Sequence, residues 1–222
     1  MSPASLGNKG ASTFISLPIL GNKNMQDKFE IAVAGAAQIG HCCKGIEKIC
    51  ELVGKEIAHQ NCNLVTGATT GVPYLVARGF KKAGGFSIGF SPATSETAHL
   101  KTYKLPIDVF DVMIYTGADY AGRNILMTKS ADGVIIVCGR MGTLHEFVTA
   151  FELKKPVGVL EGTGGTADRI RSIATGPHRG TWRIIYERNP KILVKKCSTK
   201  YDLPICALPT RTKEIGIKTS GF

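Results

Sequence analysis

The sequence lacks the long apolar run that a membrane-spanning helix requires. No stretch reaches the ~20 consecutive apolar residues needed to cross a bilayer. The first residues, MSPASLGNKGASTF, contain no charged segment leading into an apolar core, so no secretory signal is predicted. With 43% hydrophobic residues and a mean hydropathy of +0.05, the composition is typical of a soluble globular protein. We therefore expect a cytoplasmic protein that does not associate with membranes.

The sequence also lacks any CxxC pair, and its seven cysteines are an odd number. Cys42 and Cys43 are adjacent and cannot readily pair with each other. We therefore predict free thiols that act as small hydrophobic side chains in a reducing compartment. The run His41-Cys42-Cys43 has no second group of ligands at metal-binding spacing, so we predict neither a metal site nor a cofactor.

Acidic residues are scarce: 17 Asp and Glu stand against 28 Lys and Arg, which gives a net charge of +11. The excess is concentrated in residues 154–222, which carry 14 basic and five acidic side chains. Such a region either attracts polyanions such as nucleic acid or forms a solvated surface beside an anionic-ligand site. No recognised nucleic-acid-binding motif occurs in it, so the solvated surface is the favoured interpretation.

Short apolar runs alternate with helix-spaced segments along most of the chain. This βα rhythm predicts right-handed crossovers and an α/β fold, a Rossmann-like three-layer αβα sandwich with a mainly parallel sheet. We expect a flexible arm at 1–27, one Rossmann-like domain at 28–196 and an irregular basic tail at 197–222. The expected strands are 30–35, 63–67, 86–92, 109–115, 134–138, 156–160, 182–186 and 192–194; the expected helices are 44–59, 72–85, 123–130, 144–155 and 167–174.

Loops rich in glycine or threonine follow several of these strands. Since the carboxyl ends of parallel strands share one edge of the sheet, these loops predict a ligand crevice there. The first two loops contribute Gly35, Ala36, Gly67, Thr69, Thr70 and Gly71. The hydroxyls of Thr69 and Thr70 either bind a phosphate or ribose or cap the helix that follows.

The stretch 123–146, RNILMTKSADGVIIVCGRMGTLHE, is the centre of the prediction. Its VIIVC run predicts a strand buried on both faces, followed by a glycine turn and a helix. Free backbone N–H groups and the helix dipole favour a phosphate at such a turn. The expected anion-binding residues are Gly139, Arg140, Met141, Gly142 and Thr143. The alternative is an ordinary strand–helix connection.

Arg123 and Glu146 bring a guanidinium and a carboxylate to the same edge. This pairing is typical of a reactive site, and we predict that both are catalytic. Glu146 follows Thr143 by three residues, so the two also fit a capping box with no catalytic role.

These residues resemble the signature of the Lonely Guy (LOG) family of nucleoside-monophosphate phosphoribohydrolases, P-G-G-x-G-T-x-x-E preceded by R-K-x-x-M. Arg123 and Met127 keep the family spacing, and C-G-R-M-G-T-L-H-E occupies 138–146. Three positions depart from the signature, since Cys138 replaces proline, Arg140 replaces glycine and Asn124 replaces lysine. The resemblance spans about 28–175 and is closer to a divergent branch that includes molybdenum-cofactor carrier proteins.

The resemblance implies a homodimer that hydrolyses the N-glycosidic bond of a nucleoside 5′-monophosphate to free base and ribose 5-phosphate. It implies that Glu146 stabilises the developing ribosyl cation or orients the water, while Arg123 holds the phosphate or ribose or assists the departing base. The three departures favour an alternative, a non-catalytic carrier or sensor of a nucleotide-like anion. A third hypothesis is nucleic-acid handling, as in the related DNA-processing protein DprA.

Overall fold

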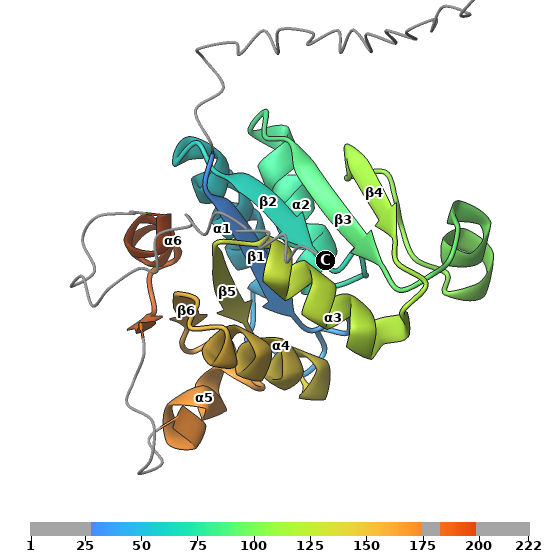
Figure 1. Ribbon diagram of the computed structural model, residues 1–222. Coiled ribbons are helices and arrows are strands. Elements are labelled where there is room, and N and C mark those ends of the chain that lie inside the picture. Colours follow the sequence, from blue (N-terminus) through green and yellow to red (C-terminus); the bar gives the residue numbers. More distant parts are fainter. Residues whose placement is uncertain (1–27, 175–182, 199–222) are drawn as a thin grey trace, which may run out of the picture.

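The computed structural model describes residues 28–174 and 183–198, which form one seven-stranded sheet with helices on both faces (Figure 1). All strand pairs are parallel, in the order β4-β3-β2-β1-β5-β6-β7. The strands are β1 (Glu30–Gly35), β2 (Asn63–Thr66), β3 (Ser87–Ser91), β4 (Val112–Tyr115), β5 (Gly133–Val137), β6 (Val157–Leu160) and β7 (Ile184–Glu187). The helices are α1 (Ile46–His59), α2 (Val72–Lys82), α3 (Asp119–Ser130), α4 (Met141–Glu152), α5 (Ala167–Ala174), α6 (Pro190–Ser198) and the short π-helix η1 (Ala98–Thr102).

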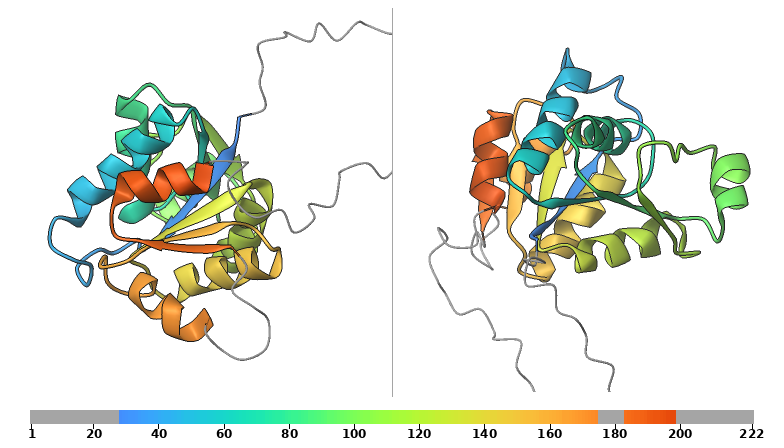
Figure 2. Two further views of the ribbon diagram at one scale, coloured as in Figure 1. Left: turned by 90° about the vertical axis from the view of Figure 1, so that its left-hand side faces the viewer. Right: turned by 90° about the horizontal axis from the view of Figure 1, so that it is seen from above.

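Two hydrophobic clusters lie on opposite faces of the sheet. One contains buried residues of α1, α2 and α6, and the other contains those of α3, α4 and α5 (Figures 1 and 2). Successive residues of β1 alternate between the clusters, with Ile31 and Val33 in the first and Ala32 and Ala34 in the second. All five residues of β5 are buried, which explains its continuous apolar run. The predicted αβα sandwich with a parallel sheet is therefore confirmed.

The last predicted strand is wrong. Residues 192–194 lie inside α6, which begins with Pro190 and buries Leu193, Val194 and Cys197 along one side. Asn189 stabilises its start, because the side-chain oxygen accepts hydrogen bonds from the backbone N–H groups of Lys191 and Ile192 at 3.0 and 3.3 Å. A run of three apolar residues fits a strand and a helix equally well, and the Asn189 cap before Pro190 is the feature that distinguishes them.

Three of the predicted segments lie wholly or partly outside the described residues. The predicted arm at 1–27 and the predicted tail from residue 199 lie outside the described residues, as does Trp182 at the start of an expected strand. The described portion of that strand is β7. Cys197 and Ser198, expected in the tail, instead complete α6. No helix within 28–174 or 183–198 combines the length and apolar character that crossing a membrane requires.

Two glycines allow α1 and α2 to pack with their backbones in contact. A methyl group on Gly54 would overlap the carbonyl oxygen of Val76, and one on Gly79 would overlap the backbone of Glu51. These helices share the most extensive helix–helix contact of the described chain. They support the loops after β1 and β2, which reach the same edge of the sheet as the turn after β5.

Candidate functional site

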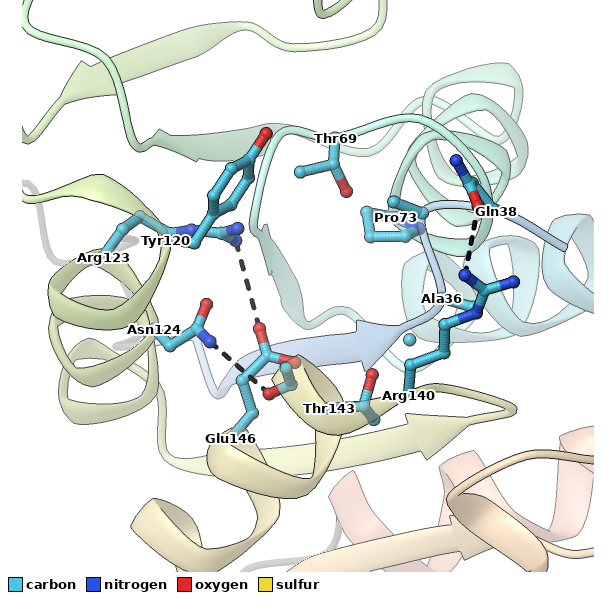
Figure 3. A pocket seen from close by; sticks show the side chains of 13 residues that line it. Ala36, Gln38, Thr69, Pro73, Tyr120, Arg123, Asn124, Arg140, Thr143 and Glu146 are labelled. Carbon is cyan, nitrogen blue, oxygen red and sulfur yellow. Dashed lines mark hydrogen bonds and ion pairs between the residues drawn. The ribbon is translucent and has the colours of Figure 1, made fainter. Parts of the chain in front are cut away.

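A pocket of about 350 Å³ opens at the carboxyl-terminal edge of the sheet (Figure 3). The loops after β1 and β2, the first turns of α3 and the turn that begins α4 form its walls. It is lined by Gly35, Ala36, Ala37, Gln38, Thr69, Pro73, Tyr120, Arg123, Asn124, Arg140, Gly142, Thr143 and Glu146. Its volume lies in the range of small-molecule sites, at roughly 300–1,000 Å³.

The structure brings most of the predicted site residues together. Eight of them line this pocket: Gly35, Ala36, Thr69, Arg123, Arg140, Gly142, Thr143 and Glu146. They come from four separate segments of the chain, so their convergence results from the parallel sheet rather than from closeness in sequence.

The other predicted residues lie beside the pocket. Gly67 lies against the Arg123 guanidinium, and a methyl group there would overlap it. Thr70 fastens two loops, since its hydroxyl donates to the carbonyl of Ala37 at 2.9 Å. Gly71 is the N-cap of α2 and has φ 68°, and no side chain caps that helix. Thr69 and Thr70 therefore do not cap α2, and that alternative is wrong.

Two residues of the predicted anion turn also lie outside the pocket lining. Met141 is 76% exposed at the rim. Gly139 has φ 108°, and a Cβ there would lie 2.6 Å from the Cβ of Thr143. Gly139 therefore shapes the turn, because only glycine combines this conformation with so close an approach.

Ala37 also lines the pocket, next to Gly35 and Ala36 in the first predicted ligand loop. The sequence pattern assigned no binding role to four further lining residues, Gln38, Pro73, Tyr120 and Asn124. Helical spacing offered a signal for one of them, since Tyr120 precedes Arg123 by three residues and lies on the same face of α3. Asn124 was recognised only as a departure from the LOG signature. The structure places it between α3 and α4, in the pocket wall (Figure 3).

The turn between β5 and α4 directs its carbonyl groups away from the pocket. The carbonyls of Cys138 and Gly139 accept hydrogen bonds from the backbone N–H groups of Ala167 and Thr166 at 2.9 and 3.1 Å. The carbonyl of Arg140 accepts one from the Thr166 hydroxyl at 2.9 Å. No side chain caps α4, and an uncapped helix start of this kind favours an anion.

The backbone conformation at Cys138 accounts for one departure from the LOG signature, the absence of proline at this position. Its backbone has φ 53°, in the left-handed region. Proline cannot adopt this conformation, because its ring fixes φ near roughly −65°. The replacement of proline by Cys138 is thus a difference in backbone shape as well as in side chain.

The predicted capping box is absent. α4 begins at Met141 with Arg140 as its N-cap, so Thr143 and Glu146 both lie within the helix. Glu146 instead faces Arg123 across the floor of the pocket (Figure 3). The carboxylate is therefore directed at the site rather than at the start of its own helix.

Arg123 and Glu146 form a buried pair of opposite charge. Arg123 is 4% exposed and Glu146 is 6% exposed, and Nη1 lies 4.0 Å from Oε1. Burial raises the pKa of Glu146 to about 7, although the Arg123 charge opposes the shift. Burial also lowers the pKa of Arg123 below its ordinary value, with Glu146 opposing. Arg123 Nε is itself buried and has no hydrogen-bond partner within the described chain.

Asn124 and Tyr120 complete this wall. The Asn124 amide lies 3.4 Å from the carbonyl of Gly142 (Figure 3). With its amide turned, it donates to Glu146 Oε1 at 3.2 Å and to the carbonyl of Tyr120 at 3.0 Å. The turned orientation satisfies both ends of the amide. The Tyr120 ring is half exposed, and the Arg123 guanidinium carbon lies 5.8 Å from its centre.

The prediction that all cysteines are free is wrong for two of them. Cys42 and Cys138 form a disulfide, while Cys43, Cys50, Cys62 and Cys197 are free. β1 and β5 are neighbours in the sheet, so the loops that follow them meet. The two cysteines are 96 residues apart in sequence, and local spacing therefore could not reveal the bond.

Comparison with known proteins identifies the family of this chain. A model of the SLOG cluster4 family matches residues 28–194. An uncharacterized protein of Archaeoglobus fulgidus is 31% identical over 140 residues, which cover 60% of this chain and 84% of the relative.

Several solved structures share the fold, and one of them is a molybdenum cofactor binding protein. The structural-genomics target TM1055 superimposes with a TM-score of 0.65 at 26% identity, covering 75% of this chain and 96% of its own. The molybdenum cofactor binding protein of the phototrophic bacterium Rippkaea orientalis gives 0.61 at 27%, covering 77% and 95%. DNA processing protein A of Helicobacter pylori gives 0.52 at 17%, covering 75% and 79%, and at this identity only the fold is shared.

Proposed function

The chain belongs to the SLOG cluster4 family, and we propose that its pocket binds a nucleoside 5′-monophosphate and hydrolyses the N-glycosidic bond. The products are free base and ribose 5-phosphate. The observation that carries the proposal is the buried Arg123–Glu146 pair, which faces an open pocket beside the uncapped start of a helix.

The phosphate rests at the start of α4 in this proposal. Gly142 and Thr143 line the pocket there, and a methyl group on Gly142 would meet no atom within 4 Å. Arg140 adds positive charge at the mouth. Its Nη1 donates to the Gln38 side-chain oxygen at 3.1 Å, which holds the guanidinium over the pocket (Figure 3). Helix dipole, free N–H groups and this cation all favour a phosphate.

Glu146 supplies the chemistry of bond cleavage. As the base departs, positive charge develops on the ribose, and a carboxylate beside it stabilises that charge or orients the attacking water. A buried carboxylate is effective here because little water screens it. Its pKa of about 7 also suits proton transfer near neutral pH. Arg123, which lines the pocket beside Glu146, holds the ribose or assists the departing base during this step.

Tyr120 offers a surface for the base. Its half-exposed ring lines the pocket opposite Thr69, so a planar base can stack on it (Figure 3). In this proposal the end of the pocket at α4 binds the phosphate, and the aromatic end at α3 binds the base.

A non-catalytic carrier is the second candidate. Arg140 occupies a position that is glycine in the LOG signature, and its guanidinium lies over the pocket. The similarity to a molybdenum cofactor binding protein at 27% identity supports the same alternative. The DprA-like hypothesis has only the shared fold and the basic composition in its favour, so we do not propose nucleic-acid binding.

We also propose a homodimer that pairs through α3 and α4. These helices pack side by side below the sheet in Figure 1. They expose large apolar side chains at Ile125, Leu126, Met141 and Val148, which are 37%, 45%, 76% and 44% exposed. A second copy would cover this surface. Sedimentation of the wild type and of a Leu126→Asp, Val148→Asp variant tests it, because a dimer would dissociate and a monomer would not change.

A panel of nucleoside 5′-monophosphates tests the function. Release of free base and ribose 5-phosphate, with loss of activity in Arg123→Ala, supports the hydrolase. Thermal stabilisation by a nucleotide without any product supports the carrier. The absence of both product and stabilisation across the panel would overturn the proposal for this ligand class.

A further inference from the structure

The disulfide lies where two segments of the pocket wall meet. Cys42 belongs to the loop after β1, which supplies Ala36, Ala37 and Gln38 to the pocket. Cys138 follows β5 and precedes the turn that supplies Arg140 and Gly142. The bond therefore fastens together two backbone segments that shape the same cavity.

The two cysteines differ in exposure. Cys138 is 0% exposed, whereas Cys42 is partly exposed. An incoming thiolate therefore reaches Cys42 Sγ, and Cys138 is the leaving group. Exchange depends on which sulfur can be attacked and on how well the leaving thiolate is stabilised.

His41 is positioned to stabilise that thiolate. Its Nε2 lies 3.5 Å from Cys138 Sγ and 3.1 Å from the carbonyl oxygen of Gly139. Its Nδ1 faces Arg140, whose Nε and Nη2 lie 3.4 and 3.3 Å away. A guanidinium only donates, so Nδ1 accepts and the ring proton is on Nε2. This N–H lies within reach of both the Gly139 carbonyl oxygen and Cys138 Sγ, and a thiolate at Cys138 would be the charged acceptor of the two.

The same three residues also resemble a metal site. The ligand atoms of His41, Cys42 and Cys138 lie within 4.8 Å of one another. However, Nε2 carries a proton in this hydrogen-bond arrangement, and the two sulfurs are bonded to each other. A metal ion would require loss of the Arg140 contact as well as reduction, so the geometry favours thiol–disulfide chemistry.

We propose that Cys42–Cys138 is a thiol–disulfide exchange site through which a dithiol reductant releases the two loops of the pocket. A thiolate of the reductant attacks Cys42 Sγ, the S–S bond breaks, and its electron pair goes to Cys138 Sγ beside His41 Nε2–H. The second thiol of the reductant then attacks the mixed disulfide and releases Cys42. Two electrons and two protons pass from the dithiol to the protein, and the reductant leaves as a disulfide.

Reduction loosens the connection between 36–45 and 138–142. The hydrogen bonds that still join these segments, from Arg140 to Gln38 and between His41 and the Gly139 carbonyl, are each weaker than a covalent bond. If loosening these segments changes the affinity for a ligand, that consequence rests on the proposed function. The exchange reaction itself does not depend on it.

Alkylation of the native full-length protein tests the exchange. The oxidised protein is treated with dithiothreitol without denaturant, quenched with iodoacetamide and analysed by peptide mass spectrometry. We expect Cys42 and Cys138 to be alkylated only after reduction, and the bond to return with oxidised glutathione. Amide hydrogen exchange in 36–45 and 138–142 should accelerate on the order of tenfold on reduction. His41→Ala should slow reduction by roughly threefold or more, because the leaving thiolate loses its donor.

Two variants distinguish the loss of this disulfide from the reaction of other cysteines. Cys42→Ser should show the fast hydrogen exchange without any reductant, while Cys43→Ser should behave like wild type. Cys42 and Cys138 that are alkylated before reduction, or reduced only in denaturant, would overturn the proposal, as would unchanged hydrogen exchange. With adenosine 5′-monophosphate as probe, a lack of binding in both redox states would count against the proposed function, while the alkylation result would still stand.

Discussion

Arg123 and Glu146 face each other with Nη1 and Oε1 4.0 Å apart, beyond hydrogen-bonding distance. Both side chains are almost fully buried, and Arg123 Nε has no partner in the described structure. Because the two side chains do not hydrogen-bond to each other, the pair retains hydrogen-bonding groups without a partner. These groups are available to a ligand or to a water molecule held between the two side chains.

Glu146→Gln tests whether the carboxylate acts on the reaction. Gln preserves the shape of the side chain and removes its charge, so we expect turnover to fall on the order of a hundredfold or more with binding retained. Steady-state and single-turnover kinetics measure the two effects separately. Arg169→Gln, an exposed change on α5, is the control and should retain wild-type turnover. A Glu146→Gln enzyme as fast as the wild type would remove Glu146 from the mechanism.

Turnover should depend on pH through Glu146. Burial raises its pKa to about 7, so the group is mostly neutral at pH 6 and mostly ionised at pH 8. If the carboxylate stabilises the ribosyl cation, kcat should rise across this interval and level off above it. The phosphate of the ligand also titrates near a pKa of about 6, so the rise should be followed in kcat under saturating ligand. A flat profile, or one that falls with pH, contradicts the carboxylate role.

Gly142→Val tests the anion site. The Cβ meets no protein atom within 4 Å, so the substitution does not crowd the protein itself, contrary to the usual expectation for a glycine in a tight turn. The added side chain instead occupies pocket space beside the start of α4. We expect affinity for phosphorylated ligands to fall at least tenfold while the free energy of unfolding changes by less than about 1 kcal/mol. Isothermal titration and urea unfolding measure the two quantities, and unchanged affinity would place the phosphate elsewhere.

Gly54→Ala tests the close packing of α1 against α2. Alanine is normally favoured over glycine within a helix by roughly 1 kcal/mol. Here the methyl group would overlap the carbonyl oxygen of Val76, and backbone cannot move aside cheaply. We expect a net destabilisation of about 1–3 kcal/mol in urea unfolding. The neighbouring exposed change Lys55→Ala should stay within about 0.5 kcal/mol, and equal stability of the two variants would contradict the packing argument.

The sequence predicted features that depend on local pattern. The buried run of β5, the glycine loops and the spacing of Arg123 and Glu146 predicted the correct fold and a resemblance to the LOG family, in agreement with the match to the SLOG cluster4 family. The capping box is absent because α4 begins three residues earlier than a Thr143 cap would place it. The prediction of free thiols was wrong for a different reason. Cys42 and Cys138 become neighbours only through the order of strands in the sheet. Alternation of strands and helices does not specify that order.

The pairing of β1 with β5 has a consequence for synthesis on the ribosome. Ile31 pairs with Gly133, so one edge of the central strand has no partner until most of the domain has been translated. At about 5–20 residues per second, this delay lasts on the order of ten seconds. During that time the nascent chain exposes an apolar strand edge of the kind that pairs with other chains. The first half of the protein therefore depends on the second half for protection from aggregation as well as for Arg123 and Glu146.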